Sequence, residues 1–334
     1  MSTMRAAVLY DVDDIRIEQR EVPAIAAGEL LVHTRASGIC TGDIMGWYVR
    51  RKAPLVLGHE PAGVVASVGD GVWDFAPGDR VFVHHHAPCF ACEACEREDY
   101  VQCATWRKSK IDPGGLAEYF RVPRENVRDT LPLPAHVPFI DGALVEPLAC
   151  VVKSIRRAGV RAGHHVYIIG LGVMGLMHAL VARARGARVS GSDFLEGRRQ
   201  HAASLGVQTV RPDRPPSGAD VVICGPGSPQ ALRDAFAAVA PGGTVVMFTP
   251  LDPVVPLTFD PNDLYFRDVN LVTSYSCGPN DTREALDLIS RGIVTAQLLG
   301  ATLYPLEEAP AAYDALRSSR ILKPIVTFEP TLFP

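Results

Sequence analysis

The sequence predicts an α/β protein with two domains, one rich in β-strands and one built on a doubly wound parallel sheet. Up to about residue 140, short apolar runs recur between Gly, Pro and Asp residues, as in a small barrel or sandwich. From residue 166 to about 291, strand-like and helical runs alternate, which implies a parallel sheet covered on both faces. The 334 residues suit roughly two domains. We place the first domain at residues 1–145, completed by 292–334, and the second at 146–291.

Each domain is assigned from its local patterns. In the first domain we expect strands at 5–10, 30–37, 63–68, 80–84 and 116–122. Helical spacing of apolar residues follows at 143–155. In the second domain we expect strands at 166–169, 188–192, 220–224, 244–248 and 270–275, and helices at 174–185, 196–205, 229–239 and 281–291. Strands at 298–304 and 324–328, around a helix near 308–317, are expected to return to the first domain.

The composition excludes several classes of protein. A net charge of −4 without a basic run gives no reason to expect binding to nucleic acid or to an anionic membrane surface. No apolar stretch approaches the ~20 residues of a membrane span, and the N-terminus has no apolar signal core. We therefore expect a cytoplasmic protein that does not bind membranes.

Four of the eight cysteines lie close together in the chain, at Cys89, Cys92, Cys95 and Cys103. In a large chain without a signal peptide, such a cluster indicates metal binding rather than disulfides. Four thiolates within fifteen residues form a closed tetrahedral set, which is typical of structural zinc. The other interpretation, four free thiols on a polar loop, would be an oxidation liability.

A second group of metal-binding residue types surrounds Cys40. Asp43 follows it in the sequence, and His59 and Glu60 come nineteen and twenty residues after the cysteine. Zn²⁺ takes ligands from such a set, and a catalytic zinc takes three protein ligands so that one position stays open. If Cys40 and His59 stood alone in the sequence, a buried thiol and a core histidine would be the simpler interpretation.

A dinucleotide-binding loop reads Gly170-Leu171-Gly172-Val173-Met174-Gly175. It directly follows a predicted strand and opens a predicted helix, which is the context that the G-x-G-x-x-G pattern requires. Asp193 ends the next strand, eighteen residues after the last glycine. A carboxylate there accepts a hydrogen bond from the ribose 2′-OH and repels a 2′-phosphate, which favours NAD over NADP. Arg198 and Arg199 lie close enough to soften that preference.

Taken together, these motifs resemble the zinc-dependent medium-chain dehydrogenase/reductase family, and most closely its polyol (sorbitol-type) and threonine dehydrogenases. The resemblance covers nearly the whole chain. Its motifs are G-I-C-x-x-D at 38–43, G-H-E at 58–60, P-G-D-R-V at 77–81, P-G-G-x-A-E-Y at 113–119, E-P-L at 146–148, the four cysteines and the glycine loop. The resemblance implies a GroES-like catalytic domain, a Rossmann domain and an active site in the cleft between them. It also implies hydride transfer between a secondary alcohol and NAD(P) at zinc.

The family's site residues match positions of this chain one by one. Cys40 and His59 match the catalytic zinc ligands, and Glu60 matches a carboxylate that ligates the metal or gives way to water and substrate. Glu146 matches the Glu of the E-P-L motif, which supplies or supports the next position. Asp43 matches the residue that orients the zinc-bound histidine and raises its basicity.

Two positions depart from the family pattern. Gly42 and Met45 stand where the family commonly has the Ser or Thr and the His that pass the substrate proton to solvent, and Thr41 is shifted by one.

His86, three residues before the first lobe cysteine, matches a substrate-facing His of threonine dehydrogenases, although a surface role is an alternative. Trp47 matches an aromatic residue that walls the substrate pocket in the polyol branch, with core packing as the alternative.

We therefore expect a dehydrogenase that oxidises a secondary alcohol with NAD and binds two zinc ions per chain. Polyols, sugars, aminocyclitols and amino alcohols all stay open as substrates, and dimers or tetramers are expected. The alternatives are an L-threonine 3-dehydrogenase-type activity and a catalytically idle NAD-binding protein. A zinc-free quinone reductase would lack Cys40, the His-Glu pair and the lobe. For the substrate proton, Glu60, Glu146 and His86 are the candidate acceptors.

Overall fold

The computed structural model describes residues 2–328, and the chain divides into two compact units. The first unit consists of Met1–Ala149 with Cys277–Pro334, and the second of Cys150–Ser276. The last six residues of the segment predicted to complete the first domain, 329–334, lie outside the described residues. Among residues 2–328, no helix has the length and apolar character that a membrane span requires.

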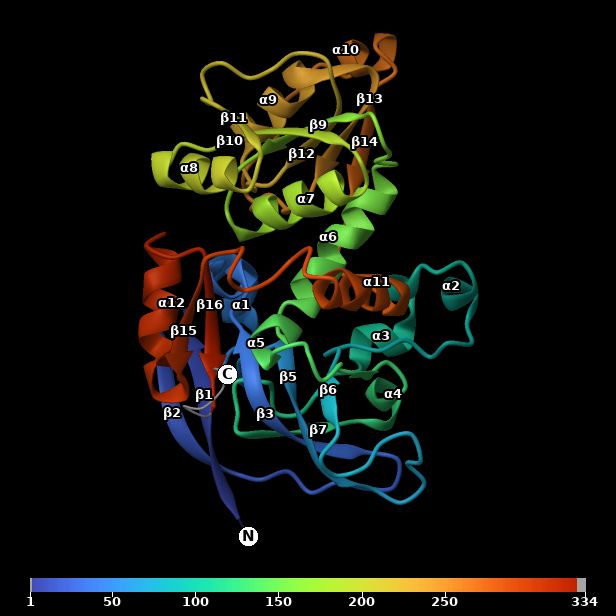
Figure 1. Cartoon of the computed structure of the whole chain (residues 1–334), viewed down its shortest axis with the longest axis vertical. Helices are drawn as coiled ribbons and strands as arrows, with labels where there is room; N and C mark the ends of the chain where they lie inside the picture. Colours follow the sequence, from blue (N-terminus) through green and yellow to red (C-terminus); the bar gives the residue numbers. More distant parts are fainter. Residues whose placement is uncertain (1, 329–334) are drawn as a thin grey trace. The chain divides into compact units, whose positions relative to one another are not determined.

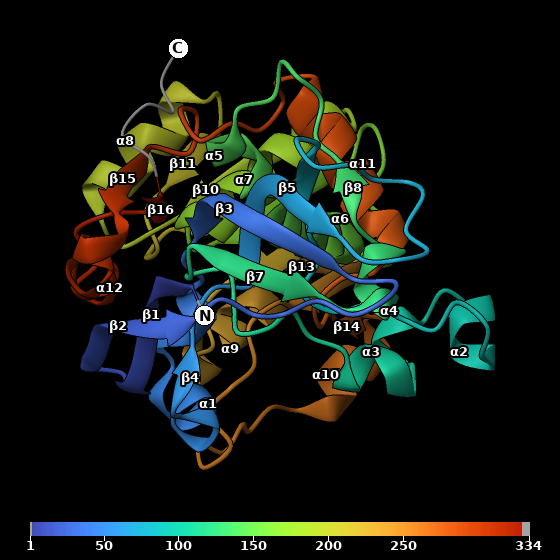
Figure 2. The same cartoon turned by 90° about the horizontal axis from the view of Figure 1, so that it is seen from below.

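Two sheets form the first unit (Figure 1). The smaller sheet has the order β2-β1-β4 and consists of β1 (Thr3–Asp11), β2 (Asp14–Glu21) and β4 (Leu55–Val56). The larger sheet has the order β15-β16-β3-β5-β6-β8, with β7 paired to β3. Its strands are β3 (Leu30–Gly38), β5 (Glu60–Val68), β6 (Arg80–Phe82), β7 (Tyr119–Val122), β8 (Leu131–Pro132), β15 (Ala301–Pro305) and β16 (Lys323–Thr327). Figure 2 shows β7 lying against β3 and β4 beside β1.

The helices of the first unit are mostly single turns placed between its strands. They are η1 (Thr41–Ile44), α1 (Gly46–Val49), η2 (Arg50–Lys52), α2 (Glu93–Glu96), η3 (Tyr100–Gln102), α3 (Ala104–Lys108), α4 (Arg124–Val127), α5 (Phe139–Gly142), α11 (Pro279–Ser290), η4 (Leu306–Glu308) and α12 (Ala309–Arg317). The helix α6 (Val145–Arg157) begins in this unit and continues into the second.

The core of the first unit explains why buried and half-buried residues alternate along its strands. Along β3, buried and half-buried residues take turns, so that Leu30 and Val32 point inward. They pack with Val65, Val81 and Phe120 from β5, β6 and β7 into one apolar cluster. Burying such side chains stabilises the fold by about 1.5–3 kcal/mol each. The strands that carry the candidate metal ligands are therefore fixed from behind by a packed interior.

The second unit is a six-stranded, fully parallel sheet with the order β11-β10-β9-β12-β13-β14. Its strands are β9 (His165–Ile169), β10 (Arg188–Ser192), β11 (Gln208–Val210), β12 (Ala219–Cys224), β13 (Val239–Met247) and β14 (Asn270–Thr273). Its helices are α7 (Val173–Ala184), α8 (Glu196–Ser204), α9 (Pro229–Ala238) and α10 (Pro261–Phe266). Figure 1 shows α7 and α8 on one face of the sheet and α9 and α10 on the other. This strand order is the doubly wound dinucleotide-binding arrangement, so the predicted fold class is confirmed.

Several element boundaries differ from the sequence predictions. The strands β2 and β4 and the helix α10 were not predicted, because their short runs carry little periodic signal. The strand predicted at 80–84 ends at Phe82, so His84 lies in the connection after β6 rather than in a strand. In the other direction, β5 starts at Glu60 rather than at residue 63, which places that carboxylate at a strand terminus.

Candidate functional site

Cys40, His59 and Glu60 come together in the first unit. One ligand atom from each, the thiol sulfur, an imidazole nitrogen and a carboxylate oxygen, lies within 4.8 Å of the other two. Cys40 stands between β3 and η1, where its Sγ accepts a hydrogen bond from the Gly42 backbone N–H at 3.3 Å. A thiolate, an imidazole and a carboxylate at this spacing suit a zinc ion that keeps an open coordination position.

Two glycines of the family motifs make room for this set. A Cβ at Gly38 would come within 1.9 Å of the Glu60 Oε2 atom, so a side chain there would displace the carboxylate. Gly58, directly before His59, has φ +93, and a Cβ there would lie 2.3 Å from the Leu116 backbone nitrogen. Both conditions favour glycine, because it tolerates positive φ and lets a backbone approach closely.

Glu60 is held by a lysine from the far end of the chain. Its side chain is fully buried, and the Lys323 Nζ atom donates to its Oε2. The same ammonium donates to the Ile39 carbonyl at 3.0 Å, so β16 ties down both the carboxylate and the segment that precedes Cys40. The other carboxylate oxygen, Oε1, has no hydrogen-bond partner among the described residues. A buried oxygen of this kind is costly unless a further group binds it, as a metal ion would.

Asp43 lies behind His59 as the resemblance implies. Its Oδ1 atom is 3.7 Å from the His59 Nδ1 atom, and the Tyr313 hydroxyl donates to its Oδ2 at 3.3 Å. Burial lowers the pKa of His59, but the charges of Asp43 and Cys40 outweigh burial and raise that pKa well above its usual value. A carboxylate on Nδ1 leaves Nε2 for the metal and fixes the ring orientation.

Glu146 lies in the first turn of α6 and is 5% exposed. Its carboxylate is not within the Cys40 group; it lies within 4.8 Å of the Cys277 sulfur instead. Burial, the charge of Cys277 and, to a smaller extent, the charge of Glu60 raise the pKa of Glu146 to about 8. One of the two carboxylates near the metal set is therefore a base that titrates close to neutrality.

The three consecutive histidines have three different surroundings. His84 is fully buried, and its Nδ1 is 2.7 Å from Asp129. His85 lies against His59, with ring centroids 5.1 Å apart, and its Nδ1 has no hydrogen-bond partner among the described residues. His86 stacks on Trp106 at 4.4 Å and contacts the Ser109 carbonyl through Nδ1, while burial lowers its pKa to about 4. Of the three rings, that of His85 packs against the predicted zinc ligand His59, whereas that of the predicted His86 packs against Trp106.

The cysteine lobe brings its four thiols together. The sulfurs of Cys89, Cys92, Cys95 and Cys103 lie within 4.8 Å of one another, and the Cys92–Cys95 and Cys89–Cys95 distances are 3.6 and 3.9 Å. Four sulfurs around zinc at about 2.3 Å would be separated by about 3.8 Å, so this set fits a closed tetrahedral zinc site.

The glycine loop of the second unit has the geometry that a pyrophosphate requires. Gly170 directly follows β9 and has φ +90. A Cβ at Gly175 would lie 2.0 Å from the Gly170 carbonyl oxygen, so glycine at this position lets the helix α7 approach the strand. Around Gly172, a Cβ would meet only the Arg198 guanidinium, at 3.7 Å. The first turn of α7, with Val173 and Met174, therefore presents its backbone N–H groups beside a cationic side chain.

Asp193 directly follows β10 and is 8% exposed. Its two carboxylate oxygens accept hydrogen bonds from the backbone N–H groups of Leu171 and Leu195, both at 2.9 Å. Arg198 lies 3.6 Å from the same carboxylate. Arg199 points elsewhere, because it donates to the Asp193 carbonyl and pairs with Glu196. The carboxylate predicted to bind the ribose is thus anchored to the glycine loop.

The fold and the two donor sets define a zinc-binding oxidoreductase with a nicotinamide cofactor, and comparison with known proteins agrees. Residues 26–135 match the alcohol dehydrogenase GroES-like domain, and residues 173–291 match the zinc-binding dehydrogenase domain. Sorbitol dehydrogenase of Bombyx mori is 31% identical, covering 98% of this chain and 99% of that protein. The chain belongs to the zinc-dependent medium-chain dehydrogenase/reductase family, as its motifs predicted.

Other relatives match this chain over nearly its full length. L-galactonate-5-dehydrogenase of Escherichia coli is 28% identical over 98% of this chain and 100% of its own. A zinc-binding dehydrogenase from Sinorhizobium meliloti, solved with bound NADP, is 29% identical with a TM-score of 0.88, covering 98% of this chain and 100% of its own. The predictions of a GroES-like domain, a Rossmann domain and an alcohol-oxidising zinc enzyme are confirmed. The alternative of a catalytically idle protein finds no support among these relatives.

Three residues of the site were not identified from the sequence. Lys323 reads as an ordinary strand-end lysine, and His85 as a neighbour of the predicted His86. Cys277 reads as an apolar buried thiol, yet its sulfur is 3.5 Å from the His84 Nε2 atom. The run of three histidines before the lobe was the one available signal for His85. Lys323 and Cys277 reach the site only through tertiary contacts.

Proposed function

We propose that the protein oxidises a secondary alcohol of a polyol or sugar derivative with NAD. The observation that carries this proposal is the Cys40–His59–Glu60 set, in which Cys40 and His59 are partly exposed, in a chain that also holds a dinucleotide loop. Relatives named for sorbitol and for L-galactonate act on polyhydroxylated molecules, which supports the substrate class. A threonine-type activity is less favoured, because His86 is turned to Trp106 and Ser109.

Two zinc ions per chain fit the donor sets. The four lobe thiols form a closed set with a structural role, whereas Cys40, His59 and a carboxylate form an open one. When bound at the open set, zinc supplies Lewis-acid polarisation of the alcohol oxygen. Asp43 holds His59 in the tautomer that leaves Nε2 available. Lys323 donates to the Oε2 atom of Glu60, which leaves the unpartnered Oε1 atom as the one that a metal ion would bind.

NAD rather than NADP is the proposed cofactor. Asp193 presents a buried carboxylate at the end of β10, and the backbone N–H groups that bind it leave lone pairs for a ribose hydroxyl. A 2′-phosphate at this position would meet that negative charge. Arg198, the nearest cation, is already 3.6 Å from Asp193, and this pairing supports the use of NAD even though a relative binds NADP.

The substrate proton needs an acceptor other than the usual relay, because Gly42 and Met45 carry no proton-transferring group. We propose Glu146 for this role, with Glu60 as the second candidate when it is released from the metal. Burial and the charge of Cys277 raise the pKa of Glu146 to about 8, and a base that titrates near neutrality suits general-base catalysis. His86, with a pKa of about 4 and its Nδ1 on a carbonyl, is a weaker base.

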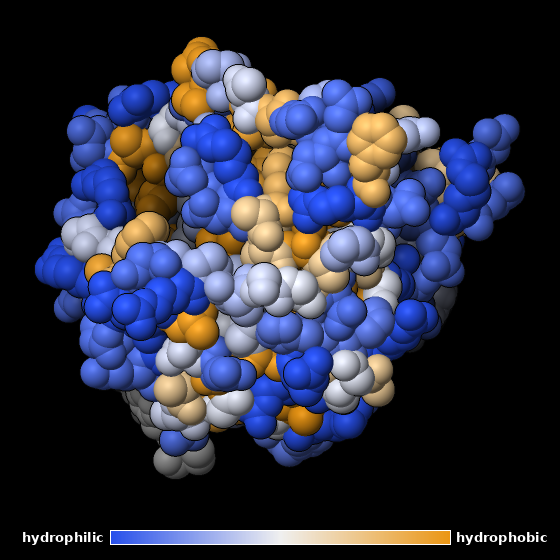
Figure 3. Space-filling model, turned by 90° about the horizontal axis from the view of Figure 1, so that it is seen from above, coloured by the Kyte–Doolittle hydropathy of each residue, from blue (hydrophilic) through white to orange (hydrophobic). Residues whose placement is uncertain are grey.

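A homo-oligomer is the proposed assembly, formed through the β14 edge of the second unit. β14 is the last strand of its sheet, and its far edge pairs with no other strand in residues 2–328. Large apolar side chains are exposed on β14 and in the chain that precedes and follows it, at Val254, Tyr265, Phe266, Leu271 and Tyr275. Figure 3 shows apolar groups breaking the polar surface on the face seen from above. An exposed apolar edge of this kind favours pairing with a second copy by a two-fold axis.

The cytoplasm is the proposed compartment. None of the eight cysteines, all of which lie in the described part of the chain, forms a disulfide. Metal-binding thiolates need the reducing conditions that this compartment maintains.

A substrate screen with zinc analysis tests the proposal. NADH formation is measured over sorbitol, xylitol, sugar acids, aminocyclitols and L-threonine, with the zinc content determined on the same preparation. We expect the highest kcat/KM on a polyhydroxylated substrate and two zinc ions per chain. The matched variant Cys40→Ala should lose one zinc ion and the activity but keep NAD binding. Highest activity on L-threonine, or one zinc ion unchanged by Cys40→Ala, would overturn it.

A further inference from the structure

Three consecutive cations form the single-turn helix η2 (Arg50–Lys52), on the segment that joins the predicted zinc ligands Cys40 and His59. All three are exposed. Their charges are not neutralised alike, because Arg50 forms an ion pair with Asp11 at 2.7 Å, whereas Arg51 has no acidic partner among residues 2–328. The helix therefore keeps positive charge that the ion pairs of the fold do not use.

An apolar cluster fixes this segment beside the metal set. Val49, the last residue of α1, is 2% exposed and packs in the same cluster as Ile39 and Leu57. Ile39 directly precedes Cys40, and Leu57 lies two residues before His59. The helix η2 begins at the residue after Val49, so the packed interior that holds the two zinc ligands also holds the base of η2.

Two of the three cations lie near one aromatic ring. The Lys52 Nζ atom is 3.7 Å from the centroid of the Tyr48 ring, and the Arg51 guanidinium carbon is 5.3 Å from it. Trp47, the predicted wall of the substrate pocket, lies edge-on to the same ring, with centroids 5.8 Å apart. Because the face of an aromatic ring attracts a cation, Tyr48 orients the ammonium of Lys52.

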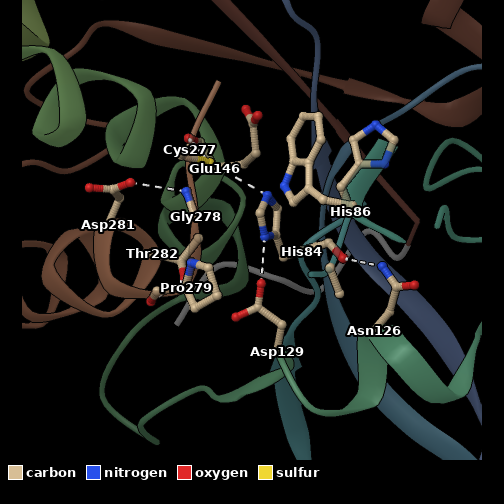
Figure 4. Close-up of polar contacts among 12 residues, drawn as sticks. His84, His86, Asn126, Asp129, Glu146, Cys277, Gly278, Pro279, Asp281 and Thr282 are labelled. Carbon is tan, nitrogen blue, oxygen red and sulfur yellow. Dashed lines mark hydrogen bonds and ion pairs between the residues drawn. The ribbon is translucent and has the colours of Figure 1, made fainter. Parts of the chain in front are cut away.

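The charge of Lys52 reaches the histidines beside the metal set. Burial lowers the pKa of His85 and of His86, and the neighbouring histidines and Lys52 lower it further. The ring of His85 packs against that of His59, and Figure 4 shows that the ring of His86 points away from the buried ring of His84. Because such a charge effect weakens with distance, Lys52 lies on the side of the first unit that carries His59.

We propose that Lys52, together with Arg51, binds an anionic oxygen group of the substrate, so that the alcohol belongs to an acidic polyol such as a sugar acid or a polyol phosphate. This inference rests on the proposed oxidation of a polyol or sugar derivative. Ammonium and guanidinium groups donate hydrogen bonds to carboxylate and phosphate oxygens that are about twice as strong as those between neutral groups. No acidic residue occurs between Asp43 and Glu60 to compete for these donors within the segment.

Matched neutral and acidic polyols test the assignment on the zinc-loaded protein. Sorbitol is compared with gluconate and with sorbitol 6-phosphate, and galactitol with galactonate and with galactitol 1-phosphate. Calorimetric titration with NADH present gives the affinities without turnover, and NADH formation from NAD gives kcat/KM. We expect one acidic series to bind and react at least about tenfold better than its neutral polyol. The series that does so, aldonate or phosphate, identifies the anionic group.

The variant Lys52→Met should lower the affinity and kcat/KM for that acidic polyol at least about tenfold. Added salt should reduce the advantage of the acidic polyol in the unmodified protein. The matched control is Arg50→Met, which removes the neighbouring cation that pairs with Asp11 and should keep the advantage. Circular dichroism and zinc content report on the folding of each variant.

Two results overturn the proposal. One is an acidic polyol that binds no more tightly than its neutral counterpart in both series. The other is an equal loss in Lys52→Met and Arg50→Met, because net charge alone would then explain the preference. Binding that depends on Lys52 without NADH formation leaves the anion site in place and overturns the proposed oxidation instead.

Discussion

Replacing Lys323 by Met tests how the buried ion pair with Glu60 controls the metal set. Methionine keeps most of the length of lysine but removes the ammonium that donates to Glu60 and to the Ile39 carbonyl. Both partners of the pair are at most 2% exposed, so no water replaces the lost donor. Removing one partner of a buried ion pair costs about 3–5 kcal/mol, because the other charge stays buried and uncompensated.

Bound zinc should reduce that loss. With the metal at Cys40 and His59, Glu60 has a second cation within reach, so the variant loses less stability when zinc-loaded than when stripped of metal. By linkage, the difference appears as tighter zinc binding in the variant. A compensation of about 2 kcal/mol would raise the zinc affinity of this site about 30-fold.

Calorimetry of zinc-loaded and chelator-stripped protein measures both effects. A loss of about 3–5 kcal/mol lowers the midpoint of the first unit by about 6–20 °C in the stripped form. The lobe zinc contributes equally to both proteins and cancels. Adding Glu60→Gln to the variant should recover part of the loss. As a control, Lys153→Met removes another buried lysine, whose Nζ donates to the Tyr275 carbonyl at 2.7 Å, and should leave the zinc affinity unchanged. Equal losses with and without zinc, together with an unchanged zinc affinity, would refute the reasoning.

Three further predictions concern the cofactor, the proton and the assembly. The unmodified protein should prefer NAD over NADP at least about tenfold, which corresponds to about 1.4 kcal/mol of binding free energy. The variant Asp193→Ser should relax this preference. If a fluorescence titration shows that NADPH binds more tightly than NADH, the role of Asp193 is excluded. Because Glu146 must be deprotonated to accept a proton, kcat for alcohol oxidation should rise with pH to a plateau above about 8, and Glu146→Gln should lower kcat and remove this rise. If Glu146→Gln and Glu60→Gln both keep the profile while His86→Ala loses activity, the carboxylate route is wrong. A charge on the sheet edge, Leu271→Lys, should shift the protein toward monomer in light scattering, whereas the exposed Trp73→Lys in the first unit should not.

The parts of the site that could be predicted from the sequence consist of residues that lie within short stretches of the chain. The glycine loop lies between a strand and a helix that are both visible in the sequence, with glycines at Gly170, Gly172 and Gly175. The four cysteines of the lobe likewise lie within one loop. Their geometry is local, so spacing alone is informative. The motif around Cys40 was similarly compact, and its glycine at residue 38 proved to be a steric requirement of Glu60.

The parts that the sequence did not predict depend on where a strand ends or on contacts between distant segments. The strand predicted at 80–84 would have included His84, but β6 ends at Phe82, and the rings of His84, His85 and His86 take separate environments. Cys277 meets His84 across 193 residues of sequence. No periodic pattern encodes such a contact, because it arises from the packing of whole elements.

The strand β16 has a consequence for how the protein is made. Glu60 and its partner Lys323 are separated by 263 residues, and at about 5–20 residues per second the ribosome needs roughly 13–53 s to pass from one to the other. During that interval the nascent chain carries Cys40, His59 and Glu60 without the lysine that pairs with the carboxylate. An ion bound at that stage would be the cationic partner of Glu60 until β16 arrives, so the last strand adds a second cation to a carboxylate that can already be compensated.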